Sequence, residues 1–205
     1  MNLCCSNNLL PVHKPSTRAL GQPRYFWEPG RMLNVHFMDG SPEQQQTVQR
    51  IAMEWPIYAN IAFRWYQPIE NSDIRITFES QGSWSYVGTI ARFVRPSDPT
   101  MAFGWVGEFT PNDDRAVILH EFGHALGLEH EHRHPHNQIK WNGEPPFWYS
   151  TIPDDKWRGY ISTLHDPESV MHYPINDEQA NITIGQNTEI SEFDKLWCAF
   201  NYSYA

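Results

Sequence analysis

The stretch HEFGHALGLEHEHRHPH, residues 120 to 136, holds six of the ten histidines of the chain within seventeen positions. Two histidines four positions apart on a helix project from the same face, so their imidazoles can bind one metal ion. His120 and His124 have this spacing. Glu121 lies about 100° further round the helix, where its carboxylate can reach a water molecule on that ion without binding the ion itself. These residue types at this spacing predict metal-assisted activation of water.

The same order of residues is the H-E-x-x-H arrangement of zinc peptidases. Gly127 can adopt the positive φ that ends a helix, after which the chain can turn back and supply His130 as a third imidazole. Three histidines leave a tetrahedral zinc ion with one open position, as catalysis requires. A chance match to H-E-x-x-H-x-x-G-x-x-H is expected about 10⁻⁴ times in a chain of this composition. We therefore expect one catalytic zinc ion, bound by His120, His124 and His130, with Glu121 as the general base.

Three further histidines compete with His130 for the third position. His132, His134 and His136 alternate along the chain, which suits an extended segment with the imidazoles on one side. The tight turn expected at Gly127 favours His130, because it leaves only a short reach. The alternatives to a catalytic site are a histidine-rich surface loop and a purely structural zinc site. A structural site is more often closed by a fourth protein ligand.

Capping signals predict the helices that position these residues. Ser41-Pro42-Glu43 combines an N-cap, a proline at the first helical position and an acidic residue in the first turn, so a helix is expected over 42–55. Thr110-Pro111-Asn112 precedes a second helix, expected from about Asp113 to about Gly127 and carrying the zinc motif. A last helix is expected from Ser191, with an apolar face at Leu196, Trp197 and Phe200.

Alternating or β-branched runs predict the strands. They are RMLNVHFM from Arg31, IAFRWY from Ile61, DIRITFE from Asp73, SYVGTIA from Ser85 and TMAFGW from Thr100. A strand, a long helix and several more strands indicate a mixed sheet with a helix packed on it. Residues 131–190 have weak periodicity and several prolines, so we expect an irregular lobe there. The fold class is therefore α+β.

Composition limits the remaining classes. The chain has 205 residues, 40% of them hydrophobic, and a net charge of −9. These values suit one folded domain and argue against nucleic acid or an anionic membrane as a partner. No apolar run approaches the roughly 20 residues of a membrane span. Cys4, Cys5 and Cys198 make a poor disulfide framework, so three free thiols are expected.

With these residues in view, the sequence resembles a known family. HEFGHALGLEH matches the long zinc motif of the metzincins, and Ser169-Val170-Met171-His172-Tyr173 resembles their Met-turn. Glu131, directly after the third histidine, is typical of the astacin group. SWSYVGT from Ser83 and ISEFDKLWCAF from Ile190 are also similar to astacin segments, so the likeness extends from about Trp27 to Tyr202.

The resemblance implies a two-lobed single domain, with a mixed twisted sheet and helices in the N-terminal lobe. The zinc helix would lie at the cleft, and the irregular C-terminal lobe would end in the final helix. We expect a loose N-terminal arm over 1–24 and an astacin-like zinc metallopeptidase domain over 25–205. Met171 would support the zinc site from below, and Tyr173 would be a movable ligand that hydrogen-bonds the reaction intermediate.

The implied activity is zinc-dependent endopeptidase, acting on a protein or peptide bound extended along an edge strand by a monomeric enzyme. The strand around Met101 to Trp105 is the candidate for this edge, with an ordinary core strand as the alternative. A catalytically silent binding module is the second hypothesis, but such a copy would be expected to lose Glu121 or a ligand. Hydrolysis of a non-peptide amide or ester is a third.

The sequence also departs from the astacin pattern. The two disulfides usual in that group are absent, and no F-x-G-D latency segment is present. Glu131 would pair with a new N-terminal amine in a mature family member, and otherwise with Arg133 or another base. Cys4 or Cys5 as a zinc-capping thiolate is the less favoured alternative to a free surface thiol. Without a recognisable signal peptide, non-classical export or an intracellular location is expected.

Overall fold

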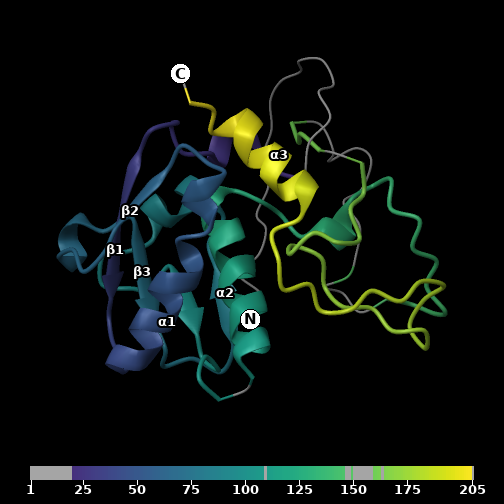
Figure 1. The fold of residues 1–205 in the computed structure, drawn as a ribbon, viewed down its shortest axis with the longest axis horizontal. Helices are drawn as coiled ribbons and strands as arrows, with labels where there is room; N and C mark the ends of the chain where they lie inside the picture. Colours follow the sequence, from purple (N-terminus) through teal and green to yellow (C-terminus); the bar gives the residue numbers. More distant parts are fainter. Residues whose placement is uncertain (1–19, 109, 146–148, 150–158, 163, 205) are drawn as a thin grey trace.

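The computed structural model describes residues 20–108, 110–145, 149, 159–162 and 164–204. Within these residues, a five-stranded sheet with helices forms one side of the molecule, and long irregular segments form the other (Figure 1). The expected α+β class with two lobes is confirmed. No helix among the described residues is long and apolar enough to cross a membrane.

The sheet is mixed and has the order β2-β1-β3-β5-β4. β1, β2, β3 and β5 run parallel to their neighbours, whereas β4 pairs with β5 in the antiparallel sense. The strands are β1 (Met32–Phe37), β2 (Ala62–Arg64), β3 (Ile74–Thr77), β4 (Ser83–Ser85) and β5 (Met101–Phe103). In β1, Leu33, Val35 and Phe37 are buried on one face, as their alternation predicts.

Two strand predictions are wrong in detail. The run SYVGTIA contributes only Ser85 to β4, and its later part forms a 3-10 helix, η4 (Gly88–Phe93), which begins where Gly88 takes a φ of +49°. β5 is not an exposed edge strand, because it lies between β3 and β4 and all three of its residues are buried. The edge on that side of the sheet is β4.

The three α-helices begin at the predicted capping residues. Ser41, Thr110 and Ser191 each accept a hydrogen bond from the third helical residue, whose side chain bonds back to the cap. The helices are α1 (Pro42–Ala52), α2 (Pro111–Leu126) and α3 (Glu192–Asn201). α1 ends three residues earlier than expected, because Trp55 lies in a separate 3-10 helix, η2 (Trp55–Ile57). α2 begins two residues before Asp113, at the proline that follows its cap.

The expected apolar face of α3 is wrong for two of its three residues. Trp197 is fully buried, but Leu196 and Phe200 are about half exposed. The buried face instead contains Asp194, Trp197 and Cys198, at positions i, i+3 and i+4. Because Asp194 is polar, the sequence pattern did not mark this face as the buried one.

Two apolar cores lie among the described residues, and the larger one extends into the irregular lobe at Val170, Met171 and Ile190. The larger core joins the sheet, α1, α2 and α3 and includes Trp55, Phe103, Phe122 and Trp197. The smaller core lies in the irregular lobe and consists of Tyr149, Ile175, Ala180 and Ile184, with Tyr173 packed against it. α3 follows the irregular lobe in sequence but packs into the core of the regular one.

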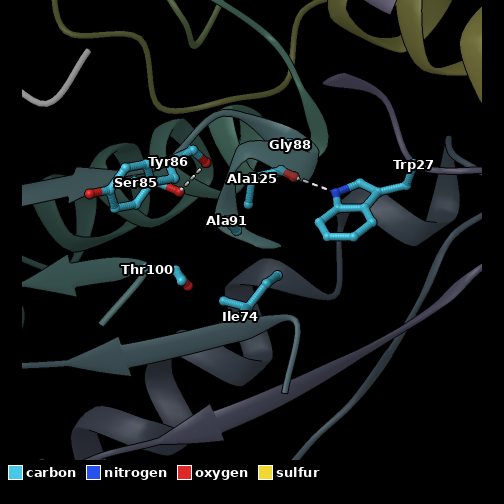
Figure 2. A pocket seen from close by; sticks show the side chains of 8 residues that line it. All are labelled: Trp27, Ile74, Ser85, Tyr86, Gly88, Ala91, Thr100 and Ala125. Carbon is cyan, nitrogen blue, oxygen red and sulfur yellow. Dashed lines mark hydrogen bonds between the residues drawn. The ribbon is translucent and has the colours of Figure 1, made fainter. Parts of the chain in front are cut away.

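Aromatic side chains bind the backbone of α2 near its C-terminal end. The indole Nε1–H of Trp27 donates to Ala125 O at 2.7 Å, as Figure 2 shows, and the Tyr202 hydroxyl donates to Leu126 O. The last carbonyls of a helix have no partner within the helix, so these bonds replace solvent at a buried helix end. They attach the zinc-motif helix to segments from both ends of the described chain.

Residues 20–22, near the end of the expected arm, are buried, whereas Pro23 and Arg24 are exposed. Leu20 is fully buried, and Gly21 forms isolated bridges with both Leu128 and Ile161. Gly21 N donates to Ile161 O at 3.0 Å, and Ile161 N returns a bond to Gly21 O at 2.8 Å. The domain boundary at 25 stays a prediction, with Leu20, Gly21 and Gln22 buried just before it. Residues 1–19, with Cys4 and Cys5, lie outside the described residues.

Candidate metal centre

α2 changes character along its length, and this change places the histidines in the interior. Its first turn is exposed and acidic, whereas every residue from Ile118 to Leu126 is buried. A helix that is buried all round belongs to a protein core. His120 and His124 therefore lie in an interior site at the junction of the two lobes.

Both helical imidazoles are oriented by backbone carbonyls. His120 Nδ1 lies 2.8 Å from Val170 O, and His124 Nδ1 lies 2.8 Å from Leu128 O. A carbonyl oxygen only accepts, so each Nδ1 is the protonated nitrogen and each Nε2 carries the free lone pair. This is the arrangement in which a histidine is ready to bind a metal through Nε2.

The turn after α2 brings in the third imidazole, as expected from Gly127. Gly127 has a φ of +106°, and Leu128 N donates back to Gly123 O at 3.0 Å. His130 Nε2 then lies 3.1 Å from His124 Nε2. Ligand atoms of His120, His124 and His130 all lie within 4.8 Å of one another, which suits one metal ion.

Burial sets the charge state of these groups. Burial lowers the pKa of His120 to about 4 and the pKa values of His124 and His130 well below the usual range, so all three rings are neutral at pH 7. Burial raises the pKa of Glu121 to about 8. Among the described residues, His120 Nε2 and Glu121 Oε2 are buried side-chain atoms without a hydrogen-bond partner. A cation with a water molecule beside it would satisfy both, so the residues present fit a zinc centre.

The predicted Met-turn passes directly under α2. Met171 is fully buried, and a Cβ on Gly123 would lie only 2.3 Å from Met171 Sδ. A side chain at this point of the helix would therefore force the Met171 side chain to shift. Met171 O also accepts a bond from Glu131 N at 3.0 Å. This bond fixes the segment after His130.

Tyr173 lies over the histidine cluster. Its ring centroid is 4.3 Å from that of His130 and 5.4 Å from that of His120. The ring is half-buried and also packs on the smaller core. The structure thus brings together all five residues that the sequence singles out.

Asp194 is a part of this site that the sequence pattern shows only as a helix cap. Its carboxylate accepts from Ser169 Oγ at 2.8 Å, Val170 N at 3.0 Å and Ser191 N at 3.1 Å. Val170 O in turn accepts a hydrogen bond from His120 Nδ1. The buried N-terminus of α3 therefore positions the Met-turn and, through it, a histidine of the cluster. The capping box S-x-x-D is the signal that locates Asp194, but it does not predict the second role.

Glu131 is buried beside two other carboxylates. Burial raises the pKa of Glu131 well above its usual range, and the charges of Asp194 and Asp166 act in the same direction. The Asp166 backbone N–H donates to Glu131 Oε1 at 2.9 Å, and the Leu20 backbone N–H also lowers the pKa of this carboxyl by hydrogen bonding. Glu131 therefore lies where the first described residue of the chain meets the Met-turn lobe.

The other candidate ligands lie outside the three-histidine group. His132 and His134 are fully buried, and the His132 ring stacks on that of His130 at 5.1 Å. His134 Nδ1 accepts from His136 N at 3.1 Å. Cys198 is a buried free thiol in the larger core, and burial raises its pKa well above the usual range. The turn at Gly127 thus selects His130, as its position predicts.

Known proteins with the same fold were found by sequence and by structure. The chain matches the Astacin peptidase family over residues 20–203. Zinc metalloproteinase nas-10 of Caenorhabditis elegans is 27% identical over 141 residues, which cover 56% of this chain and 24% of that protein. Zinc metalloproteinase nas-9 of the same organism is 37% identical over 117 residues, 44% of this chain and 21% of that protein. This chain thus spans about a quarter or less of the length of these relatives.

Two solved structures extend the comparison. Myroilysin is 30% identical with a TM-score of 0.81, and the match covers 91% of this chain and all of that chain. High choriolytic enzyme 1, a hatching enzyme zinc-protease from Oryzias latipes, has a TM-score of 0.61 at 18% identity, with 88% and 95% of the two chains covered, and supports the fold alone. The cofactor of these relatives, zinc, agrees with the donor set of the three-histidine group. Since the family match covers nearly all of the described residues, the chain belongs to the astacin family of peptidases.

Proposed function

We propose that this chain is a zinc-dependent endopeptidase in which His120, His124 and His130 bind the zinc ion. The observation that carries the proposal is the convergence of three neutral imidazoles beside a buried glutamate that has no hydrogen-bond partner at Oε2. The catalytic unit would include Leu20 to Gln22, because these residues are buried and Gly21 forms bridges with Leu128 and Ile161.

Glu121 is the proposed general base. A zinc ion at the three imidazoles supplies a Lewis acid that makes water acidic near neutral pH and polarises a carbonyl oxygen. Glu121 takes a proton from the attacking water and later returns it to the departing amine. Its pKa is about 8 because of burial alone, and the charge of a nearby dication lowers that value toward the range of a base active at neutral pH.

Tyr173 and Met171 complete the proposed site. The Tyr173 ring lies 4.3 Å from the His130 ring, so small side-chain rotations move its hydroxyl toward or away from the metal ligands. Its hydroxyl would donate a hydrogen bond to the oxygen on which negative charge develops. Met171 touches no reacting atom, and its role is to support α2 from below at Gly123.

The proposed substrate is a protein or peptide that adds to β4 as an extended strand. β4 is the last strand of the sheet on this side, and α2 packs against it. Gly82 O and Tyr86 N bond to the β5 side, so by alternation the backbone groups of Ser83 and Ser85 point away from β5, with Ser83 half-buried and Ser85 buried. Backbone hydrogen bonds at such an edge bind a peptide with little dependence on its sequence.

The test combines metal content with peptide cleavage in wild type and Glu121→Gln. Both proteins should bind zinc at the three-histidine centre, and only wild type should cleave a mixed peptide library, with loss of activity on chelation. The variant should be slower by about 10²- to 10⁴-fold. Glu192→Gln, at a surface carboxylate of α3 with 85% of its side chain exposed, is the matched control and should be fully active. Equal activity of Glu121→Gln and wild type would exclude this mechanism.

A further inference from the structure

A second pair of histidines faces each other outside the three-histidine group. His165 Nε2 and His172 Nε2 are 3.1 Å apart, and their ring centroids are 5.2 Å apart. His172 follows Met171 in the Met-turn and is buried, whereas His165 lies in the preceding loop and is partly exposed. The pair therefore combines a fixed imidazole with one that solvent can reach.

The orientation of His172 is the one already seen in the three-histidine group. His172 Nδ1 lies 2.7 Å from Tyr173 O, so Nδ1 is the donor and Nε2 carries the lone pair. His124 has the same backbone anchor at Nδ1 and the same 3.1 Å separation from a second imidazole Nε2. The chain thus builds this two-imidazole arrangement twice.

The 3.1 Å separation suits two ligands of one ion. With metal–nitrogen bonds of about 2.0–2.1 Å, two ligand nitrogens lie about 2.9 Å apart at a right angle and about 3.3 Å apart at the tetrahedral angle. The observed distance falls between these values. An N–H···N hydrogen bond between neutral rings has a similar length, so the two interpretations differ in metal binding rather than in geometry.

A third imidazole is close but already committed. The His134 ring centroid lies 6.1 Å from that of His165, and His134 Nδ1 accepts a bond from His136 N at 3.1 Å. A neutral ring that accepts at Nδ1 carries its proton on Nε2, so His134 has no free lone pair without a change of tautomer. The pair would therefore hold an ion with two imidazoles and leave the other coordination positions to water.

We propose that His165 and His172 bind a second divalent transition-metal ion of the kind that prefers imidazole ligands, such as zinc, nickel or copper. With two protein ligands instead of three, this site binds more weakly than the three-histidine centre. The carboxylate of Asp166, next to His165 in the chain, adds favourable negative charge. Because His172 Nδ1 donates a hydrogen bond to the Tyr173 carbonyl, an ion here would also restrain the segment that carries the proposed movable tyrosine.

The test counts bound metal and needs no activity, and it rests on the proposed function only in assigning the first equivalent to the three-histidine centre. The full chain is dialysed against increasing zinc chloride, and bound zinc is measured per chain. Wild type should bind one equivalent tightly and a second at higher concentration. His165→Gln should keep the first equivalent and lose the second, since glutamine can still hydrogen-bond His172 but is a poor zinc ligand.

His36→Gln is the matched control. His36 is also anchored through Nδ1, to Gln67 O at 2.7 Å, but lies on β1 in the other lobe. This variant should bind both equivalents. His165→Ala serves as a second variant if His165→Gln does not fold, as judged by circular dichroism. Binding of one equivalent by wild type, or of two by a folded His165 variant, would overturn the proposal.

Discussion

The two lobes reach order by different means. In the N-terminal lobe, ladder hydrogen bonds and a large apolar core hold the backbone. The irregular lobe, residues 128–190, has a core of its own of only four described residues with their partly buried neighbours, while its Leu128, Val170, Met171 and Ile190 pack into the larger core. Regular ladders are replaced there by side-chain bonds to backbone carbonyls. Three asparagines of this lobe each donate to two carbonyls: Asn137, Asn142 and Asn187. Backbone polar groups must be satisfied in either case, but here each bond depends on one side chain.

The metal centre lies across the boundary between these two lobes. His120 and His124 come from a helix of the larger core, whereas His130, Met171 and Tyr173 come from the irregular lobe. A metal ion at this point would join the lobe with the sheet to the irregular lobe. Since binding energy at such a site is also folding energy, the difference in local stability between the two lobes should depend on the metal.

The largest effect should come from removing His130, the proposed zinc ligand that lies in the irregular lobe. His130→Ala should lower zinc affinity on the order of 10²- to 10³-fold, because zinc binding of about 10–16 kcal/mol is shared among few ligands. Peptidase activity should fall to background. Hydrogen exchange should rise at residues 169–173, where Met171 O bonds the segment after His130, and stay slow in β3, which is held by ladder bonds to β1 and β5. Equal acceleration in both lobes would contradict the comparison.

The same contrast explains what the sequence could predict. Capping boxes, alternation in β1 and the histidine spacing are local signals, and they predicted the three helices, most strands and the grouping of His120, His124 and His130. Long-range strand pairing was harder to predict from the sequence. β5 resembles β4 locally, and only the order of strands in the sheet makes β4 the edge. The contacts of Asp194 and the pairing of His165 with His172 join residues distant in sequence and depend on the path of the irregular lobe. No periodicity encodes that path.

A second, smaller effect concerns the charge buried between the lobes. In metal-free protein, burial raises the pKa of Glu121 from its usual 4.5 to about 8. Between these values the folded state holds a proton that the unfolded state has released, so stability falls as pH rises from 4.5 to 8. The loss is on the order of a few kcal/mol. Glu121→Gln should lack this component, as measured by urea unfolding with a chelator at several pH values.

The matched comparison for that experiment is the zinc-loaded protein. A dication beside Glu121 favours its charged form, so the difference in pH dependence between wild type and Glu121→Gln should shrink when zinc is present. Without metal, the free energy of unfolding of wild type could instead rise with pH relative to that of Glu121→Gln. This result would show that Glu121 is stabilised as a carboxylate. It would then contradict the charge state assigned by burial.

An added methyl group distinguishes the interface of the lobes from the outer loops. Gly123→Ala places a Cβ 2.3 Å from Met171 Sδ and 3.2 Å from Trp55 Cζ2, so it should destabilise the fold by about 1–3 kcal/mol through overpacking. Zinc affinity should fall as well, because the Met-turn is displaced. Gly143→Ala, where no atom lies within 4 Å of the added Cβ, should leave both quantities nearly unchanged. Thermal unfolding and zinc titration of the two variants provide the measurement.

Two capping aspartates test how far α3 controls the irregular lobe. Asp194→Asn should cost about 1–3 kcal/mol, because one buried oxygen loses its charge and an amide group meets donors at Ser169, Val170 and Ser191. Asp113→Asn changes the same position in the capping box of α2, where the carboxylate is exposed, and its effect should be small. Similar costs for the two variants would mean that Asp194 acts only as a helix cap.

The smallest effect is expected on the outer face of α3, and it tests the register of that helix. Leu196 and Phe200 are 48% and 54% exposed, so Leu196→Gln and Phe200→Gln should change the free energy of unfolding by no more than about 0.5 kcal/mol each. Trp197→Ala removes a fully buried side chain and should cost about 3–5 kcal/mol. If Leu196→Gln instead cost as much as a buried substitution, α3 would be rotated. Asp194 would then point away from the Met-turn, and the link from α3 to His120 would be lost.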